Sequence, residues 1–195
     1  MLINVKNCRN CRQFHDFFLF SKSTRCSHAC QEGHHRVVSA LIFHGADCNI
    51  RTKDGQRTPI QVALASGYPN IAKILYYHGK AQVNITTTKG RTVLHLCAMF
   101  ADAYDLLEAI LAVRKLDIDT QDKYGNTPLH YAVKCGSLEM VKLLVEAGAD
   151  IKTRNQANMT PLHIAIYMWV LEKRKKIETV TLNDKMRFLN TNKKC

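Results

Sequence analysis

Apolar residues recur along this chain in short blocks with the spacing of helices. Between residues 127 and 150, the first block has the spacing of one helix face and is formed by Leu129, Ala132 and Val133. The second block repeats that spacing and is formed by Leu138, Val141, Leu144 and Val145. Thr127 and Pro128 suit the N-cap and first turn of a helix, and Gly136 and Gly148 suit helix ends. The pattern therefore predicts two short helices joined by a tight turn.

This pattern occurs five times. The threonines that begin the units fall at positions 24, 58, 92, 127 and 160, at spacings of 34, 34, 35 and 33 residues. The phrase Thr-Pro-Leu-His occupies 127–130 and 160–163, and Thr-Pro-Ile-Gln occupies 58–61. Residues 92–97 carry a looser copy and residues 24–29 a degraded one. One unit buries too little apolar surface alone, so neighbouring units are predicted to stack.

The units strongly resemble the ankyrin repeat, with its Thr-Pro-Leu-His box and a Gly-Ala-Asp ending, which stands here at 148–150. The resemblance covers residues 24–168. It implies an all-α solenoid of about five helix–turn–helix units joined by short β-hairpin loops. Residues 1–23 are then a basic N-terminal segment with cysteines and aromatics, and residues 169–195 a basic C-terminal cap or tail.

Some units depart from the ankyrin pattern. In the third unit Val93 replaces the proline and Ala101 replaces the glycine, so we expect this unit to be irregular. Gly55 lies one position early in the turn of the second unit. Asn158 replaces the turn glycine of the fifth, and asparagine can imitate its left-handed geometry. After Trp169 the second-helix pattern is lost, as expected of a terminal unit.

The net charge of +12 is concentrated at the two ends of the chain. Residues 1–23 carry +3 and residues 170–195 carry +5, which leaves +4 for the 146 residues between them. This distribution argues against a domain shaped around nucleic acid. The basic run Lys173, Arg174, Lys175 and Lys176 is of a kind that serves as a nuclear import signal, although a solvated helix face has the same composition.

The eight cysteines allow two interpretations. No secretion signal or membrane-spanning run is recognisable, so we expect a cytoplasmic chain, or a nuclear one, with reduced thiols and no membrane insertion. A zinc site could use ligands of the N-terminal region: Cys8, Cys11, Cys26, His28 and Cys30. Alternatively, Cys26, Cys30 and Cys97 fill small apolar positions of the box and lie in the core. We favour the core interpretation and expect no metal.

The histidines of the boxes, His95, His130 and His163, occur once per unit. The ankyrin resemblance implies that they tie the capping threonine to the next turn by hydrogen bonds. No nucleophile–base set, phosphate loop or pair of carboxylates at catalytic spacing accompanies them, so we expect neither an enzyme nor a cofactor.

The resemblance also implies a concave surface that binds other proteins through the hairpin tips and late first-helix positions. The residues predicted to bind partners are Lys89, Arg91, Met99, Phe100, Lys123, Tyr124, Asn126, Lys134, Tyr167 and Met168. Phe100 could instead pack inward, because the third unit is irregular. The predicted function is a non-catalytic interaction module, a scaffold or adaptor. The alternatives are an ankyrin-type regulator of a transcription factor, or a zinc- or nucleic-acid-binding protein that uses the basic, cysteine-bearing ends.

Overall fold

The computed structural model describes residues 22–53, 55–112 and 116–174. The chain forms two compact units, Met1–Leu116 and Asp117–Cys195. The described residues are helices joined by turns and loops, with no β-strand among them. The prediction of an all-α fold is confirmed.

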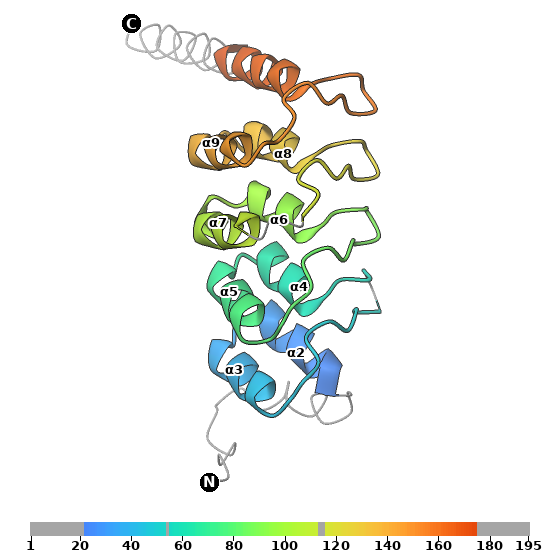
Figure 1. The fold of residues 1–195 in the computed structure, drawn as a ribbon, viewed down its shortest axis with the longest axis vertical. Coiled ribbons are helices and arrows are strands. Elements are labelled where there is room, and N and C mark those ends of the chain that lie inside the picture. The colour runs from blue at the N-terminus through green and yellow to red at the C-terminus, as the bar shows by residue number, and fades with distance from the viewer. Residues whose placement is uncertain (1–21, 54, 113–115, 175–195) are drawn as a thin grey trace, which may run out of the picture. The chain divides into compact units, whose positions relative to one another are not determined.

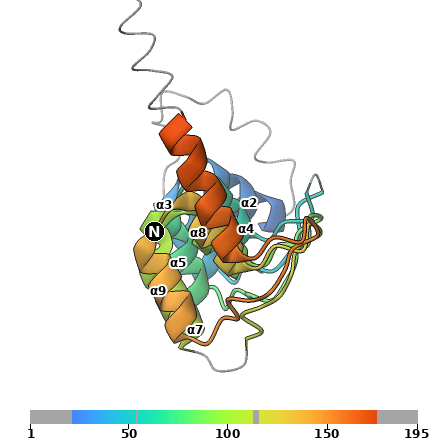
Figure 2. The same cartoon turned by 90° about the horizontal axis from the view of Figure 1, so that it is seen from above.

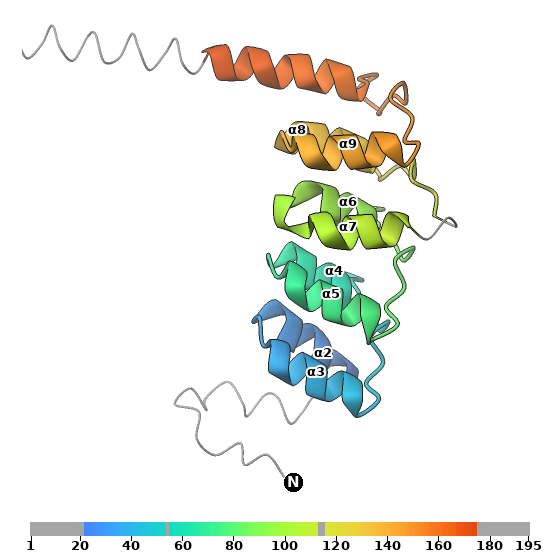
Figure 3. The ribbon, with the colours of Figure 1, turned by 60° about the vertical axis from the view of Figure 1, so that its left-hand side comes forward.

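The described residues of the first unit form three helical pairs (Figure 3). In chain order they are α2 (Lys22–Gln31) with α3 (His35–Phe43), α4 (Pro59–Ala65) with α5 (Pro69–Tyr77), and α6 (Val93–Met99) with α7 (Tyr104–Leu111). The helices α2, α4 and α6 form one layer, and α3, α5 and α7 form the other (Figure 1). The loops that precede α4 and α6 project from the same end of these helices (Figures 1 and 2). Corresponding loop positions of successive repeats are therefore neighbours.

The two layers differ in burial. The helix α4 buries six of its seven residues, from Pro59 to Leu64, and α6 buries Val93 to Ala98. The outer helix α5 buries only the side formed by Ile71, Ala72 and Leu75. Because α4 and α6 are covered on nearly every side, their sequences are apolar apart from Gln61 and His95, whereas the outer helices are amphipathic.

The third repeat is irregular, as its sequence predicts. The chain leaves α6 in extended geometry at Phe100 (φ −127°, ψ 114°) and makes a 3₁₀ turn, η2 (Ala101–Ala103), before α7. In the first, second and fourth repeats a left-handed glycine stands at this point, with φ values of 77° at Gly33, 80° at Gly67 and 74° at Gly136. Alanine adopts that conformation only with strain, so the chain takes a different path.

The second unit contains α8 (Pro128–Cys135), α9 (Leu138–Glu146) and a helix over residues 161–174. This last helix continues without a break through the predicted boundary between residues 168 and 169. At the other end of the chain, α2 already includes Thr24, so this threonine is not the N-cap that its alignment with the other boxes suggested.

The prediction for the buried side of α9 was wrong in part. Leu144 is buried as expected, but its partner on that side is Met140. Leu138 and Val145 are 58% and 43% exposed. At about 100° per residue, Leu138 lies about 200° around the helix from Met140, so the two cannot share a face.

Candidate functional site

The hairpin loops have one geometry in four successive repeats. Each is closed by a backbone hydrogen bond, between Thr52 and Arg57, Thr87 and Arg91, Asp122 and Asn126, and Asn155 and Met159 (N···O 2.8–3.0 Å). The residue before each closing position is left-handed: Gln56, Gly90, Gly125 and Asn158. The expectation for Asn158 is confirmed. In the second repeat Gln56, not Gly55, takes this conformation, and the loop is one residue longer.

The box residue three positions after each threonine supports the helix start. In the second unit the Nδ1 atom of His130 accepts the Thr127 backbone N–H (3.1 Å), and its Nε2–H donates to the Met159 carbonyl (3.1 Å). In the first unit Gln61 makes equivalent bonds: Oε1 accepts the Thr58 N–H (3.0 Å), and Nε2 donates to the Ile85 carbonyl. The implied structural role of His130 is thus borne out by its contacts, and glutamine can fill it.

The other two box histidines cap their helices in the same way. His95 is fully buried, and its Nδ1 accepts the Thr92 N–H (3.1 Å). His163 is exposed, and its Nδ1 lies 2.7 Å from the Thr160 hydroxyl. Each of these rings is held at its own helix start.

A buried carboxylate orders the hairpin tip of the second unit. The Oδ2 atom of Asp122 accepts the Tyr131 hydroxyl (2.6 Å), and its Oδ1 accepts the backbone N–H groups of Tyr124 (2.9 Å) and Asn126 (3.0 Å). The Asn126 side chain accepts a bond from Asn155 on the next hairpin (2.9 Å). Asn126 therefore joins two hairpins, while Tyr124, 52% exposed, and Lys123 point to solvent.

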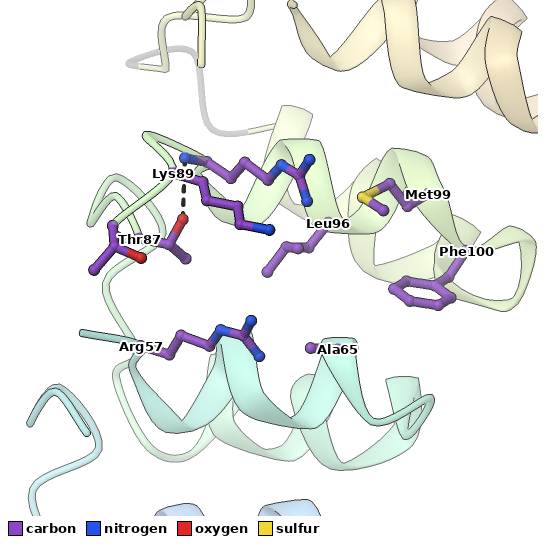
Figure 4. Close-up of a pocket in the computed structure, with 9 residues that line it drawn as sticks. Arg57, Ala65, Thr87, Lys89, Leu96, Met99 and Phe100 are labelled. Carbon is purple, nitrogen blue, oxygen red and sulfur yellow. Dashed lines mark hydrogen bonds between the residues drawn. The ribbon is translucent and has the colours of Figure 1, made fainter. Parts of the chain in front are cut away.

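Four predicted partner-binding residues surround one pocket of the first unit (Figure 4). The pocket has a volume of about 140 Å³, and we call it the hairpin pocket. Its lining is Arg57, Ala65, Thr87, Thr88, Lys89, Arg91, Leu96, Met99 and Phe100. Met99 and Phe100 are partly exposed, so Phe100 lines the pocket and is not fully packed inward. Sequence reasoning missed Arg57, which comes from the preceding repeat.

The remaining predicted residues belong to the second unit. Lys134 and Tyr167 are exposed, and Met168 is partly exposed. Lys173 and Arg174 of the basic run are exposed, and the Lys173 ammonium lies 5.7 Å from the centre of the Trp169 ring. Lys175 and Lys176 lie outside the described residues.

Three cysteines meet in the core of the first unit. Cys26, Cys30 and Cys48 are buried, and the Cys26 thiol is hydrogen-bonded to both of the others. The bond with Cys30, together with burial, raises the pKa of Cys26 to about 12. Burial alone raises the pKa of the Cys97 thiol to about 12. Cys26 and Cys30 thus behave as core residues, as the favoured interpretation held, and Cys48 joins them from a loop 22 positions along the chain.

The zinc alternative gains no support from these positions. His28 is exposed, whereas Cys26 and Cys30 on the same helix are buried. Within the part of the chain that the structure describes, no group of three or more His, Cys, Asp or Glu side chains could hold a metal ion. Cys8 and Cys11 lie outside the described residues.

These thiols give a direct test of the register. Cys26, Cys30, Cys48 and Cys97 are expected to react slowly with a bulky thiol reagent in the native protein, because burial blocks access to their sulfur atoms. Exposed Cys135 is expected to react much faster. The measurement is time-resolved labelling followed by peptide mass spectrometry, with urea-unfolded protein as the control for intrinsic reactivity. Rapid native labelling of Cys97 would contradict the position of α6.

The chain matches the family model described as "Ankyrin repeats (3 copies)" over residues 7–87, 26–122 and 94–181. These matches span most of the chain, so the protein belongs to the ankyrin repeat family. In the described residues, no helix is both long enough and apolar enough to pass through a bilayer.

Three relatives with similar repeats come from a virus, an animal and a bacterium. Ankyrin repeat protein FPV031 of Fowlpox virus (strain NVSL) is 31% identical over 115 residues, which are 57% of this chain and 33% of that protein. Rabankyrin-5 of Homo sapiens is 32% identical over 121 residues, 62% of this chain and 10% of that protein. Phosphocholine transferase AnkX of Legionella pneumophila subsp. pneumophila (strain Philadelphia 1) is 30% identical over 118 residues, 58% of this chain and 12% of that protein. The chain thus spans a third or less of the length of each of these three.

Proposed function

We propose that this chain is a non-catalytic protein-interaction module that acts as a scaffold or adaptor. It binds partners through the hairpin tips and through the late residues of the first helix of each repeat. The hairpin pocket is the observation that supports this proposal, because basic hairpin residues and large apolar residues of α6 meet there. Apolar anchors near arginine and lysine are the usual composition of a binding hot spot. Ankyrin repeats generally mediate protein–protein interactions, which supports the same conclusion.

The chemistry of the buried groups also favours binding over catalysis. Cys26 and Cys97 have a raised pKa, so almost no thiolate is present at neutral pH to act as a nucleophile. The Nδ1 atoms of His95 and His130 already accept backbone N–H groups. The zinc- or nucleic-acid-binding alternative depends on chain ends that lie largely outside the described residues.

Replacing Phe100 with alanine is expected to weaken the binding of a captured partner by about 1–4 kcal/mol, the range of aromatic anchors at interfaces. Tyr124→Ala is expected to act in the same range if the partner also reaches the second unit. Stability should change little, because both side chains are at least partly exposed. The measurement is quantitative affinity capture from cell lysate, followed by titration of the purified partner.

A matched control is Tyr77→Ala. Tyr77 is 60% exposed at the end of the outer helix α5, away from the hairpin pocket, so its removal should leave the affinity unchanged. Changing Lys173, Arg174, Lys175 and Lys176 together to alanine should also preserve the affinity at moderate salt. If the basic-run change abolishes binding while Phe100→Ala does nothing, the contact is electrostatic and terminal, and the proposal is wrong.

A further inference from the structure

Building on the proposed function, we infer that the hairpin pocket recognises an acidic segment of a partner protein. The segment carries an Asp or Glu carboxylate next to a large apolar side chain. The carboxylate meets the basic hairpin residues, and the apolar side chain enters between the two repeats.

The charge of the lining carries the first part of this inference. Arg57, Lys89 and Arg91 line the pocket, and none of its nine lining residues is acidic. Arg57 and Lys89 are exposed, and they come from the loops that precede α4 and α6. Two loops of adjacent repeats thus present cations to one small volume, where an arriving carboxylate forms charge-assisted hydrogen bonds.

Among the described carboxylates of the first unit, neither Asp105 nor Asp102 lines the pocket beside Arg57 and Lys89. Asp105, at the start of α7, forms an ion pair with Lys73 on α5, in the outer layer of the unit. Asp102 lies on η2 and is exposed, but it is not part of the lining. The hairpin loop itself is held by a bond from the Arg91 backbone N–H to the Thr87 hydroxyl (3.2 Å; dashed in Figure 4), which fixes the position from which Lys89 reaches out.

The other end of the pocket is apolar. Leu96 is 6% exposed and lies between the hairpin residues and Met99, while partly exposed Met99 and Phe100 lie at the end away from the hairpin (Figure 4). The volume of about 140 Å³ is well below the roughly 300–1,000 Å³ of small-molecule sites. It suits a single side chain, so the occupant is a segment of a larger partner whose remaining contacts lie outside the pocket.

The same features favour an acidic protein segment over nucleic acid. The lining holds at most three cations, which can neutralise only a few phosphates, whereas duplex-binding proteins typically make about 6–10 phosphate contacts. Phe100 is the one aromatic residue of the lining, so successive bases have no row of rings on which to stack. Competition by an oligonucleotide is therefore an outcome of the test.

The experiment selects short random peptides, displayed on phage, against the whole chain. The expected result is enrichment of Asp or Glu beside Leu, Ile, Met or Phe. When the Arg57→Glu/Lys89→Glu variant is the target of the selection, the enriched peptides should lose their acidic residues and carry Lys or Arg instead. Both residues are exposed, and an unchanged circular dichroism melt would show that the variant folds.

The affinity of one selected peptide is then measured by fluorescence anisotropy. Arg57→Gln/Lys89→Gln should weaken binding about tenfold at low salt, and less as salt screens these exposed charges. Replacing the peptide's acidic residues by their amides should cause a similar loss with the native chain and little loss with the double variant. Arg36→Gln/Lys142→Gln removes the same kinds of charge from exposed positions on α3 and α9, and should change the affinity less than about twofold.

Each contrary outcome has a distinct meaning. Peptides without acidic residues, whose binding Phe100→Ala weakens, would overturn the acidic-segment inference and leave the proposed binding site intact. Selected peptides that bind equally well to the Arg57, Lys89 and Phe100 variants would overturn both. The inference also fails if no peptide is enriched, if the control pair lowers affinity as much, or if a random single-stranded oligonucleotide displaces the acidic peptide at a lower concentration than the peptide itself.

Discussion

Replacing Leu129 with alanine is expected to lower the free energy of unfolding by about 2–5 kcal/mol, because a fully buried leucine leaves a cavity that its neighbours fill only partly. The Leu129 side chain is 2% exposed on α8. Urea unfolding, followed by far-UV circular dichroism at unchanged slope, measures the loss. A change below about half a kilocalorie would contradict the register of the fourth repeat.

The matched control is Leu138→Ala, which removes the same atoms from a side chain that is 58% exposed on α9. Surface substitutions of this kind usually change stability by less than about 0.5 kcal/mol. If the two variants lose equal stability, burial in the structure does not explain the effect at Leu129.

Replacing His130 with alanine is expected to have a similarly large effect. It leaves the buried Thr127 N–H without its acceptor, at about 1–3 kcal/mol for one unsatisfied buried group, and it also removes the hydrogen bond to the Met159 carbonyl, which keeps its bond from the Asn155 N–H. His130→Gln should cost much less, because Gln61 already makes this pair of bonds in the second repeat. Equal losses for the two variants would mean that packing of the ring, not its hydrogen bonds, supports the repeat.

The same pair of variants tests the pH dependence. Burial lowers the pKa of His130 below its ordinary value of 6.5, and the Met159 carbonyl and Asp122 only partly offset that effect. Below about pH 6.5 the unfolded chain therefore binds more protons at this position than the folded chain, so stability falls as the pH falls. The stability that His130 contributes is therefore fully present above about pH 6.5, and it is lost as the pH falls through the lowered pKa of the folded protein.

His130→Gln removes this titration while it keeps the hydrogen bonds. The difference in unfolding free energy between the native chain and His130→Gln should then shrink as the pH falls from neutral to about 5. A difference that stays constant over this range would show that His130 does not titrate with a lowered pKa.

The sequence alone determined the repeat, the helix starts and most of the turns, because these features depend on residues a few positions apart. A threonine cap needs only the residue three positions on, and a left-handed turn needs only a residue that tolerates it, as at Gly136 and Asn158. Even the irregular third repeat followed from the absence of a glycine at Ala101. Two local features were predicted wrongly: Thr24 lies inside α2 instead of capping it, and Gln56 takes the left-handed position expected for Gly55 because its loop has an extra residue.

The register of the repeats in the sequence also predicted part of the candidate site. Lys89, Arg91, Met99 and Phe100 belong to one hairpin and the helix that follows it, so the ankyrin pattern could place them on one side of a repeat. Their common function remains a prediction. The pattern could not distinguish Tyr124, which points to solvent, from Asn126, whose amide is bonded to the next hairpin.

What only the tertiary structure decided depends on contacts between residues far apart in the sequence. Arg57 joins Lys89 in one pocket across 32 residues of sequence, and Cys48 reaches Cys26 across 22. The buried side of α9 likewise follows from what covers it, not from which of its residues are apolar. Each such environment includes residues that lie far away in the sequence, and no local pattern records them. The chain's own periodicity thus specifies the repeat, whereas tertiary packing creates the pocket and the core thiol cluster.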